Sequence, residues 1–217
     1  MNERAALPPF SAIIVAAGQG QRAVQPVPKQ FAPWRGKPVL RHSVDRLLGA
    51  GAAHIVIAIP PGADDIARHA AGDDSRLTFV AGGETRQSSV AKALDALTNA
   101  ATDHVLIHDA ARPIIPADVI ERLLAALKSS PGAIPTLPVV DSLAVSRNGL
   151  MDGSAQRDTL RRVQTPQAFR YEAILAAHRA WTGEASAGDD AQVLRAHGGS
   201  VALVEGDEAL HKLTFSE

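Results

Sequence analysis

The feature that most constrains the fold is a regular alternation of short apolar runs with helix-like segments along the chain. The apolar runs fall at residues 12–17, 54–59, 77–81, 104–108, 133–138 and 200–205. Helical periodicity covers residues 39–50, 64–71, 87–97, 116–128, 171–181 and 189–196. Such alternation is typical of a mostly parallel sheet with helices on both faces. We therefore predict a single Rossmann-like α/β domain spanning residues 1–217.

One segment, residues 140–162, departs from this alternation. Polar and apolar residues alternate in it around Asn148-Gly149, a pair typical of a two-residue hairpin turn. A projecting two-stranded hairpin buries little surface by itself and therefore packs on something else. Two placements are open. The hairpin serves as a dimerisation arm on a partner subunit, or it folds back over its own domain.

Charge and composition narrow the possible partners. The chain has 22 Lys and Arg against 23 Asp and Glu, so nothing favours electrostatic binding of nucleic acid. It has no cysteine, which excludes a disulfide framework and thiolate metal sites. No apolar run is long enough to span a membrane, and the first ten residues do not resemble a signal peptide. We expect a cytoplasmic protein without a membrane partner.

The first apolar run ends in a glycine-bearing loop that contains Gly18 and Gly20 and leads to the cations Arg22 and Lys29. Such a loop is suited to a polyphosphate, because glycines let backbone N–H groups approach the anion and the cations neutralise it. The alternative is a surface loop with solvated charges. A dinucleotide site is disfavoured, because Ala23 stands where the third glycine belongs and no acidic residue ends the second strand.

Two further strand ends carry polar residues. Asp109 follows the fourth predicted strand, where a carboxylate can hold a divalent cation or a sugar hydroxyl, or can cap a turn and pair with Arg112. Gly82-Gly83 follows the third strand and leads to Ser89, which suits a flat base but also an ordinary strand-to-helix connection. Because the carboxyl ends of parallel strands meet at one edge of the sheet, these loops are expected to converge.

Other cations are less informative from the residues alone. Arg157 lies near the base of the hairpin with two more arginines, a pattern typical of a solvated face. Lys212 stands alone near the end of the sequence, where a lysine is usually inert. No metal-binding histidine pair and no Gly-x-Ser-x-Gly motif points to a zinc enzyme or a hydrolase.

Taken together, the motifs resemble the 2-C-methyl-D-erythritol 4-phosphate cytidylyltransferase family, whose fold is of the nucleotide-diphospho-sugar transferase type. The matching strings, in the order of the family, are Ala16-Ala17-Gly18-x-Gly20-x-Arg22, Pro28-Lys29-Gln30, Gly82-Gly83-x-x-Arg86-x-x-Ser89-Val90, His108-Asp109-Ala110-Ala111-Arg112-Pro113, Thr165-Pro166-Gln167 and the segment around Lys212. The resemblance implies transfer of CMP from CTP to methylerythritol phosphate with release of pyrophosphate. It also implies a homodimer formed through the arm.

The resemblance implies a role for each matching residue. Arg22 and Lys29 would stabilise the α-phosphate and the departing pyrophosphate, while Arg157, from the partner's arm, and Lys212 would hold the acceptor phosphate. Asp109 would contact hydroxyls and help to hold Mg²⁺ or another divalent cation. The substrate-binding residues would be Ala16, Ala17, Gly18, Gly20, Gly83, Glu84, Ser89, Asp109, Ala110, Arg112 and Thr165, with Gly83, Glu84 and Ser89 reading the cytosine.

Departures from the pattern of the family leave alternatives open. Glu84 stands where Asp is common, and the extra methylene moves the carboxylate that would read the base. Another polyol or sugar phosphate, such as ribitol 5-phosphate, is the alternative acceptor. A nucleotide-binding regulatory protein without catalysis and an NAD-dependent oxidoreductase are the remaining hypotheses. The sequence is either that of a stand-alone enzyme or the cytidylyltransferase part of a bifunctional relative.

Overall fold

The computed structural model describes residues 7–18, 27–100 and 102–213. Within these ranges eight strands form the main sheet, in the order β10-β7-β11-β6-β1-β4-β5, with β12 on β7. The strands are β1 (Phe10–Val15), β4 (Ile55–Ile59), β5 (Leu77–Ala81), β6 (His104–Asp109), β7 (Gly132–Pro138), β10 (Arg161–Val163), β11 (Gln167–Arg170) and β12 (Val201–Glu205). Each predicted strand is present, with bounds within two residues of the expected ones.

The sheet is mostly parallel, as predicted. Strand β1 pairs in parallel with β4 and β6, β4 pairs with β5, and β7 pairs with β12. Strand β11 runs antiparallel between β6 and β7, and β10 runs antiparallel to β7. These two antiparallel strands were not predicted. They place Thr165, which lies between them, beside the end of β6.

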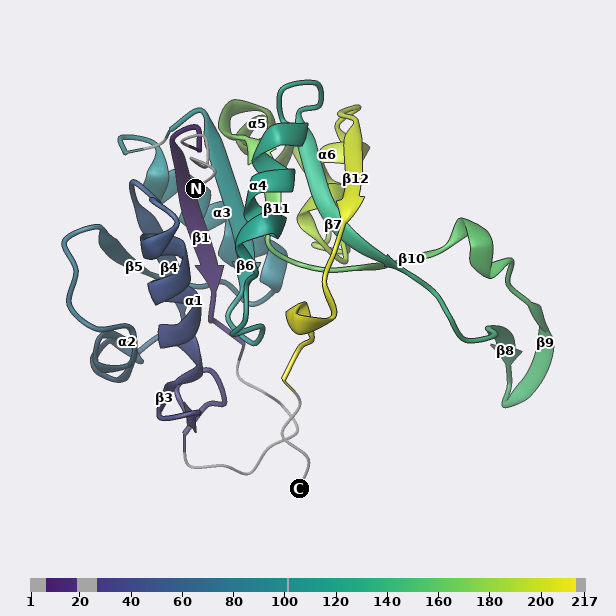
Figure 1. The fold of residues 1–217 in the computed structure, drawn as a ribbon, viewed down its shortest axis with the longest axis horizontal. Coiled ribbons are helices and arrows are strands. Elements are labelled where there is room, and N and C mark those ends of the chain that lie inside the picture. Colours follow the sequence, from purple (N-terminus) through teal and green to yellow (C-terminus); the bar gives the residue numbers. More distant parts are fainter. Residues whose placement is uncertain (1–6, 19–26, 101, 214–217) are drawn as a thin grey trace, which may run out of the picture.

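In the described part of the chain, helices α1 to α6 cover the two faces of the sheet (Figure 1). One hydrophobic core lies under α1 (Val39–Gly49), α2 (Asp64–Ala71) and α4 (Ala117–Ala126). The other lies under α3 (Arg86–Leu97), α5 (Tyr171–Ala180) and α6 (Asp190–Ala196). The two cores follow from the alternation of side chains along a strand, since Ile14 in β1 belongs to the first core and its neighbour Ile13 to the second. None of the described helices is long and apolar enough to cross a bilayer.

A short hairpin of β2 (Pro33–Trp34) and β3 (Lys37–Pro38), which was not predicted, precedes α1. Its turn is built by Arg35 and Gly36, both with positive φ. The hairpin connects the segment that holds Lys29 to helix α1, and the backbone of Leu40 donates to the carbonyl of Gln30 at 2.9 Å. The phosphate-loop segment is therefore anchored to the core of the domain.

The predicted arm consists of β8 (Ala144–Arg147), β9 (Leu150–Ser154) and the 3-10 turn η1 (Arg157–Thr159). Both turn residues, Asn148 and Gly149, have positive φ, as a tight hairpin turn requires. The arm extends away from the body (Figure 1), so the alternative in which it folds back over its own domain is wrong. Its expected end at residue 162 is also wrong, because residues 161–163 pair with β7 in the main sheet.

Candidate functional site

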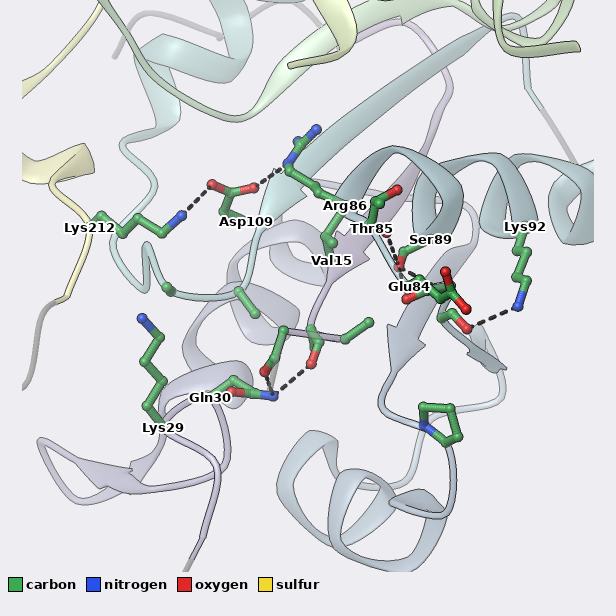
Figure 2. Close-up of a pocket in the computed structure, with 18 residues that line it drawn as sticks. Val15, Lys29, Gln30, Glu84, Thr85, Arg86, Ser89, Lys92, Asp109 and Lys212 are labelled. Atoms are coloured by element: carbon green, nitrogen blue, oxygen red, sulfur yellow. Dashed lines mark hydrogen bonds and ion pairs between the residues drawn. The ribbon is translucent and has the colours of Figure 1, made fainter. Parts of the chain in front are cut away.

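A cavity of about 780 Å³ lies outside the carboxyl ends of β1, β5 and β6 (Figure 2). This is the edge at which open α/β sheets bind ligands. The structure brings ten of the predicted site residues together there: Ala16, Ala17, Gly18, Lys29, Gly83, Glu84, Ser89, Asp109, Ala110 and Lys212. The predicted convergence of the three strand-end loops is confirmed.

The loop after β1 is held by a glutamine that the sequence analysis noted only as part of a motif. The side-chain amide of Gln30 is buried and donates to the carbonyls of Ala16 at 2.7 Å and Gly18 at 3.1 Å. Beside it, Lys29 points into the cavity (Figure 2). Gly20 and Arg22, the other residues predicted for this loop, lie outside the described residues.

The loop after β5 approaches the first loop so closely that it admits only glycine. A Cβ added to Gly82 would lie 2.3 Å from Cβ of Ala17, and one added to Gly83 would lie 2.2 Å from Oγ of Ser88. Oγ of Ser89 accepts from the Gly83 N–H at 3.0 Å, and Lys92 donates to the Gly82 carbonyl at 3.0 Å. The two glycines thus leave room for a flat ligand beside a fixed turn.

The local sequence also explains why helix α3 begins where it does. Thr85 caps its first turn, and its side chain forms a capping box with Ser88. Oγ of Ser89 donates to the carbonyl of Thr85 at 2.8 Å, which ties the turn to the helix. Glu84, just before this cap, lines the cavity. The polar residues at 84–89 therefore both cap the helix and border the cavity.

Asp109 is the charged centre of the site. Its Oδ1 accepts from Nε of Arg86 at 3.0 Å, its Oδ2 accepts from Nζ of Lys212 at 3.2 Å, and Arg112 lies 3.9 Å away. Burial by itself would raise the pKa of Asp109, but the cations of Arg86 and Lys212 outweigh it and hold the pKa well below its usual range. Asp109 is therefore a carboxylate at neutral pH, surrounded by positive charge.

Behind Asp109 lies a buried hydrogen-bonded group. Nε2 of His108 donates to the carbonyl of Arg112 at 2.8 Å, so Nδ1 is the acceptor and receives the hydroxyl proton of Thr165 at 3.1 Å. The same hydroxyl oxygen accepts from the N–H of Asp109 at 3.1 Å. Burial lowers the pKa of His108 to about 4, so the ring is neutral. Thr165 thus fixes the backbone of Asp109.

Three predicted site residues do not line the cavity of their own chain. Thr165 is buried beside it. Arg112 donates to the carbonyl of Leu210 at 2.6 Å and so holds the turn η2 (Glu208–Leu210), which precedes Lys212. Arg157 lies on the exposed arm and donates to the carbonyl of Val140 at 2.9 Å. Thr165 and Arg112 support the site from behind, whereas Arg157 is not brought to it within one chain.

Arg86 and Lys92 also line the cavity but were not predicted as site residues. Arg86 also donates through Nη1 to Oδ2 of Asp190 at 2.8 Å. The two carboxylates outweigh the effect of burial and raise the pKa of Arg86 above its usual range. The signal for Arg86 was its place in the Gly82-Gly83 motif, but no short spacing points to Asp190.

Comparison with known proteins gives a consistent result. The sequence model of the 2-C-methyl-D-erythritol 4-phosphate cytidylyltransferase family matches residues 10–217. A bifunctional enzyme IspD/IspF of Erythrobacter litoralis is 64% identical over 211 residues, which make up 97% of this chain and 55% of that protein. A 2-C-methyl-D-erythritol 4-phosphate cytidylyltransferase of Cereibacter sphaeroides is 48% identical over 209 residues, 94% of this chain and 91% of that one. The chain thus spans about half the length of the first curated relatives it matches.

Solved structures agree with the sequence matches. The crystal structure of 2-C-methyl-D-erythritol 4-phosphate cytidylyltransferase from Thermus thermophilus superposes with a TM-score of 0.76 at 33% identity. The match covers 95% of this chain and 93% of that one. The similarity therefore includes the sheet, the helices and the edge that carries the cavity.

Proposed function

The chain belongs to the 2-C-methyl-D-erythritol 4-phosphate cytidylyltransferase family, and we propose that it transfers CMP from CTP to 2-C-methyl-D-erythritol 4-phosphate. The observation that carries this proposal is the placement of Lys29 and Lys212. Both point toward the same end of the cavity, whose other end holds the two-glycine turn (Figure 2). Phosphates at the lysine end and a base at the turn match the two parts of a nucleotide.

The reaction needs positioning and charge neutralisation more than acid–base chemistry. An oxygen of the acceptor phosphate attacks the α-phosphorus of CTP, and the bond from that phosphorus to the oxygen bridging to the β-phosphate breaks. Pyrophosphate leaves with the bonding electron pair. The acceptor phosphate is already ionised at neutral pH, so no general base is required. Lys29 and Lys212 stabilise the charge that builds on the phosphate oxygens, together with Arg22, which is assigned from the family motif alone.

Asp109 is the residue that would hold Mg²⁺ or another divalent cation. Its carboxylate lines the cavity and is ionised, and Mg²⁺ is commonly bound by one or two carboxylates together with substrate phosphates. Among the described residues no group of three or more acidic or histidine side chains could form a metal site alone, so water and substrate phosphate oxygens would supply the other ligands. The ion would supply further neutralisation of phosphate charge.

The base-binding end is assigned to the turn after β5. Gly83, Glu84 and Ser89 surround the space beside Ala17, and Ala110 lies at the end of β6, where the ribose would pass. Oγ of Ser89 already accepts from the Gly83 N–H and donates its one proton to the carbonyl of Thr85. Ser89 therefore fixes the turn and engages the N–H of Gly83, which leaves the carbonyl of Gly83 and the side chain of Glu84 to read the cytosine.

An assay of pyrophosphate release tests the proposal. Folded protein is supplied with Mg²⁺, CTP and methylerythritol phosphate, and then with ribitol 5-phosphate or another sugar phosphate in place of the acceptor. We expect turnover with methylerythritol phosphate and a strong preference for CTP over UTP. Turnover with ribitol 5-phosphate alone would favour the alternative acceptor. CTP binding without any product would favour a regulatory protein and contradict the proposal.

We also propose that two copies of the chain assemble through the arm and that Arg157 enters the partner's site. The arm exposes large apolar side chains: Val140 is 69%, Leu150 75% and Met151 71% exposed. Isolated hydrophobic side chains are common on surfaces, but a group of them on a projecting ribbon marks an interaction surface. Arg157 at the base of the same ribbon has no contact with its own cavity and would be carried toward a partner's.

Sedimentation of charged variants tests the assembly. Replacing Leu150→Asp and Met151→Asp together puts two charges on the arm, and we expect the dimer to dissociate into folded monomers. Ala96→Asp places a charge at an exposed position of helix α3 in the body and serves as the control, which we expect to remain dimeric. A wild-type chain that sediments as a monomer at all concentrations would contradict the assembly but not the transfer reaction.

A further inference from the structure

A row of charged side chains runs from the interior of the protein to the cavity. Asp190, the first residue of α6, is 1% exposed, and its Oδ2 accepts from Nη1 of Arg86 at 2.8 Å. Nε of the same guanidinium donates to Oδ1 of Asp109 at 3.0 Å, and Oδ2 of Asp109 accepts from Lys212. Arg86, Asp109 and Lys212 line the cavity, whereas Asp190 does not. Four residues from four segments thus form one connected line.

The far end of this line is fixed by the fold. Oδ1 of Asp190 lies 3.3 Å from Nε2 of His178, whose side chain is 2% exposed in α5, although the two atoms make no hydrogen bond. Asp190 begins α6, whose Val193 and Leu194 pack in the second core together with residues of α5. Burial and its place at the start of α6 confine the Asp190 side chain, so it can serve as an anchor for Arg86.

The planar shape of the Arg86 guanidinium explains how Asp190 can affect a side chain in the cavity. A guanidinium is planar and presents its N–H groups in a fixed fork, so two carboxylates held at two of its nitrogens determine its orientation. With only one carboxylate, the fork is free to turn and to contact both oxygens of that group. Asp190 thus keeps Arg86 on Oδ1 of Asp109 and leaves Oδ2 facing Lys212.

We propose that Asp190 is a positioning residue for the transfer reaction: acting through Arg86, it fixes the orientation of the Asp109 carboxylate in the cavity. Asp190 touches no substrate in this arrangement. This inference rests on the proposed function for its kinetic consequence, but the geometric part concerns the chain alone. It also gives a reason for burying a carboxylate next to an arginine. Such a pair loses hydration free energy on burial, and apolar side chains often stabilise a core equally well or better.

A double-mutant cycle tests the kinetic consequence. Asp190→Asn keeps the shape and removes the charge, and we expect kcat to fall about ten- to a hundredfold with KM for CTP changed by less than about threefold. Arg86→Ala is expected to lower kcat at least as much. In the Arg86→Ala background, Asp190→Asn should change kcat by less than about twofold, because the arginine side chain that links Asp190 to Asp109 is already absent.

The control is the neighbouring carboxylate. Asp189 caps α6 by accepting from the N–H of Gln192 at 2.9 Å and has no contact with Arg86. Asp189→Asn removes the same charge at the same helix end while Asn can still cap α6, and we expect kcat within about twofold of wild type. Equal losses in Asp189→Asn and Asp190→Asn, or effects of Asp190→Asn and Arg86→Ala that simply multiply, would overturn the inference and indicate a general role in folding.

Crystal structures without substrate provide a readout that does not depend on turnover. In Asp190→Asn we expect the guanidinium of Arg86 to turn and the Asp109 carboxylate to rotate, while Asp189→Asn keeps both as in wild type. An unchanged Arg86–Asp109 pair in Asp190→Asn would overturn the inference. Arg86→Lys, which cannot reach both carboxylates, serves as a second variant should Asp190→Asn not fold, and the same rotation is expected. If wild type shows no turnover, the proposed function fails, but the crystal structures still test whether Asp190 orients Arg86 and Asp109.

Discussion

Nζ of Lys212 lies 3.2 Å from Oδ2 of Asp109, although 103 positions separate the two residues in the sequence. The contact arises because the chain leaves β12, forms η2 and returns across the carboxyl edge of the sheet, where the N–H of Leu213 donates to the carbonyl of Ala111 at 2.8 Å. The same crossing is held by Arg112 through the carbonyl of Leu210. Lys212 is therefore placed at the cavity by backbone contacts, although about half of its side chain stays exposed.

Removing Lys29 tests the role of the lysine end of the cavity. We expect Lys29→Ala to lower kcat about a hundred- to a thousandfold, because one preorganised charge contact to the reacting phosphates is worth about 3–4 kcal/mol. The measurement is steady-state pyrophosphate release with saturating CTP and acceptor. Lys128→Ala, at an exposed position outside the cavity, should have the activity of wild type. Comparable losses in both variants would contradict the assigned role.

Substituting Gly82 tests the close approach of two loops. The Cβ of alanine at this position would lie 2.3 Å from Cβ of Ala17 and 2.9 Å from Oγ of Ser89, so the turn must shift. We expect Gly82→Ala to lower the free energy of unfolding by about 1–3 kcal/mol and to weaken CTP binding measured by calorimetry. Gly49→Ala has open space around its Cβ and should weaken neither quantity. Wild-type affinity for CTP in Gly82→Ala would show that this turn does not border the base.

The buried His108 predicts a dependence of stability on pH. Burial lowers its pKa to about 4 in the folded chain, against 6.5 for an exposed histidine. The nearby cations of Arg112 and Arg86 also lower this pKa, whereas the hydrogen bond to the Arg112 carbonyl and the charge of Asp109 oppose the lowering. Between these pH values the unfolded chain binds a proton that the folded chain does not, so stability is complete above pH 6.5 and falls as the pH drops.

We expect the free energy of unfolding to decrease by about 2 kcal/mol between pH 7 and pH 5 on account of His108. Urea titrations at the two pH values, in metal-free buffer, provide the measurement. His108→Gln carries no titratable group, and its decrease should be smaller than that of wild type by this amount. Parallel curves for the two proteins would show that His108 does not supply the pH dependence.

Mixing two inactive chains tests whether Arg157 acts across subunits. Arg157→Ala and Lys29→Ala are each expected to be nearly inactive alone. In a heterodimer, one of the two cavities combines an intact Lys29 with an intact arm from its partner, so up to half of the sites should regain activity. The measurement is turnover after co-expression and tandem-affinity isolation of the heterodimer. Verified heterodimers without any recovered activity would place Arg157 outside the partner's site.

The sheet and helices were predictable because each is signalled locally. A parallel strand such as β4, Ile55–Ile59, is apolar throughout since both of its faces are covered, and the helices beside it carry apolar residues at helical spacing. Strand β11 gave no such signal. It has four residues, begins with the buried Gln167 and follows Pro166, and its strand conformation depends on β6 and β7 on either side. Pairing with distant strands cannot be inferred from so short a run.

The candidate site divides in the same way. Asp109 and Gly83 were predictable because they follow strands whose ends share one edge, and the family motifs reinforced them. Asp190 was not, since it meets Arg86 across 104 positions of sequence and no local pattern links them. Likewise Lys92 enters the cavity only because α3 turns that face toward the loop after β5. Residues that support a site from behind are set by packing, which a local pattern does not encode.

The exposed ribbon has a practical consequence. Residues 140–152 bury nothing against the body of their own chain, so the cooperative unfolding of that body does not depend on them. A screen that ranks monomers by melting temperature would therefore pass substitutions on the ribbon, including those that would abolish the proposed pairing. Changes there must be screened by dilution, where loss of activity per chain at low concentration would reveal what heating cannot.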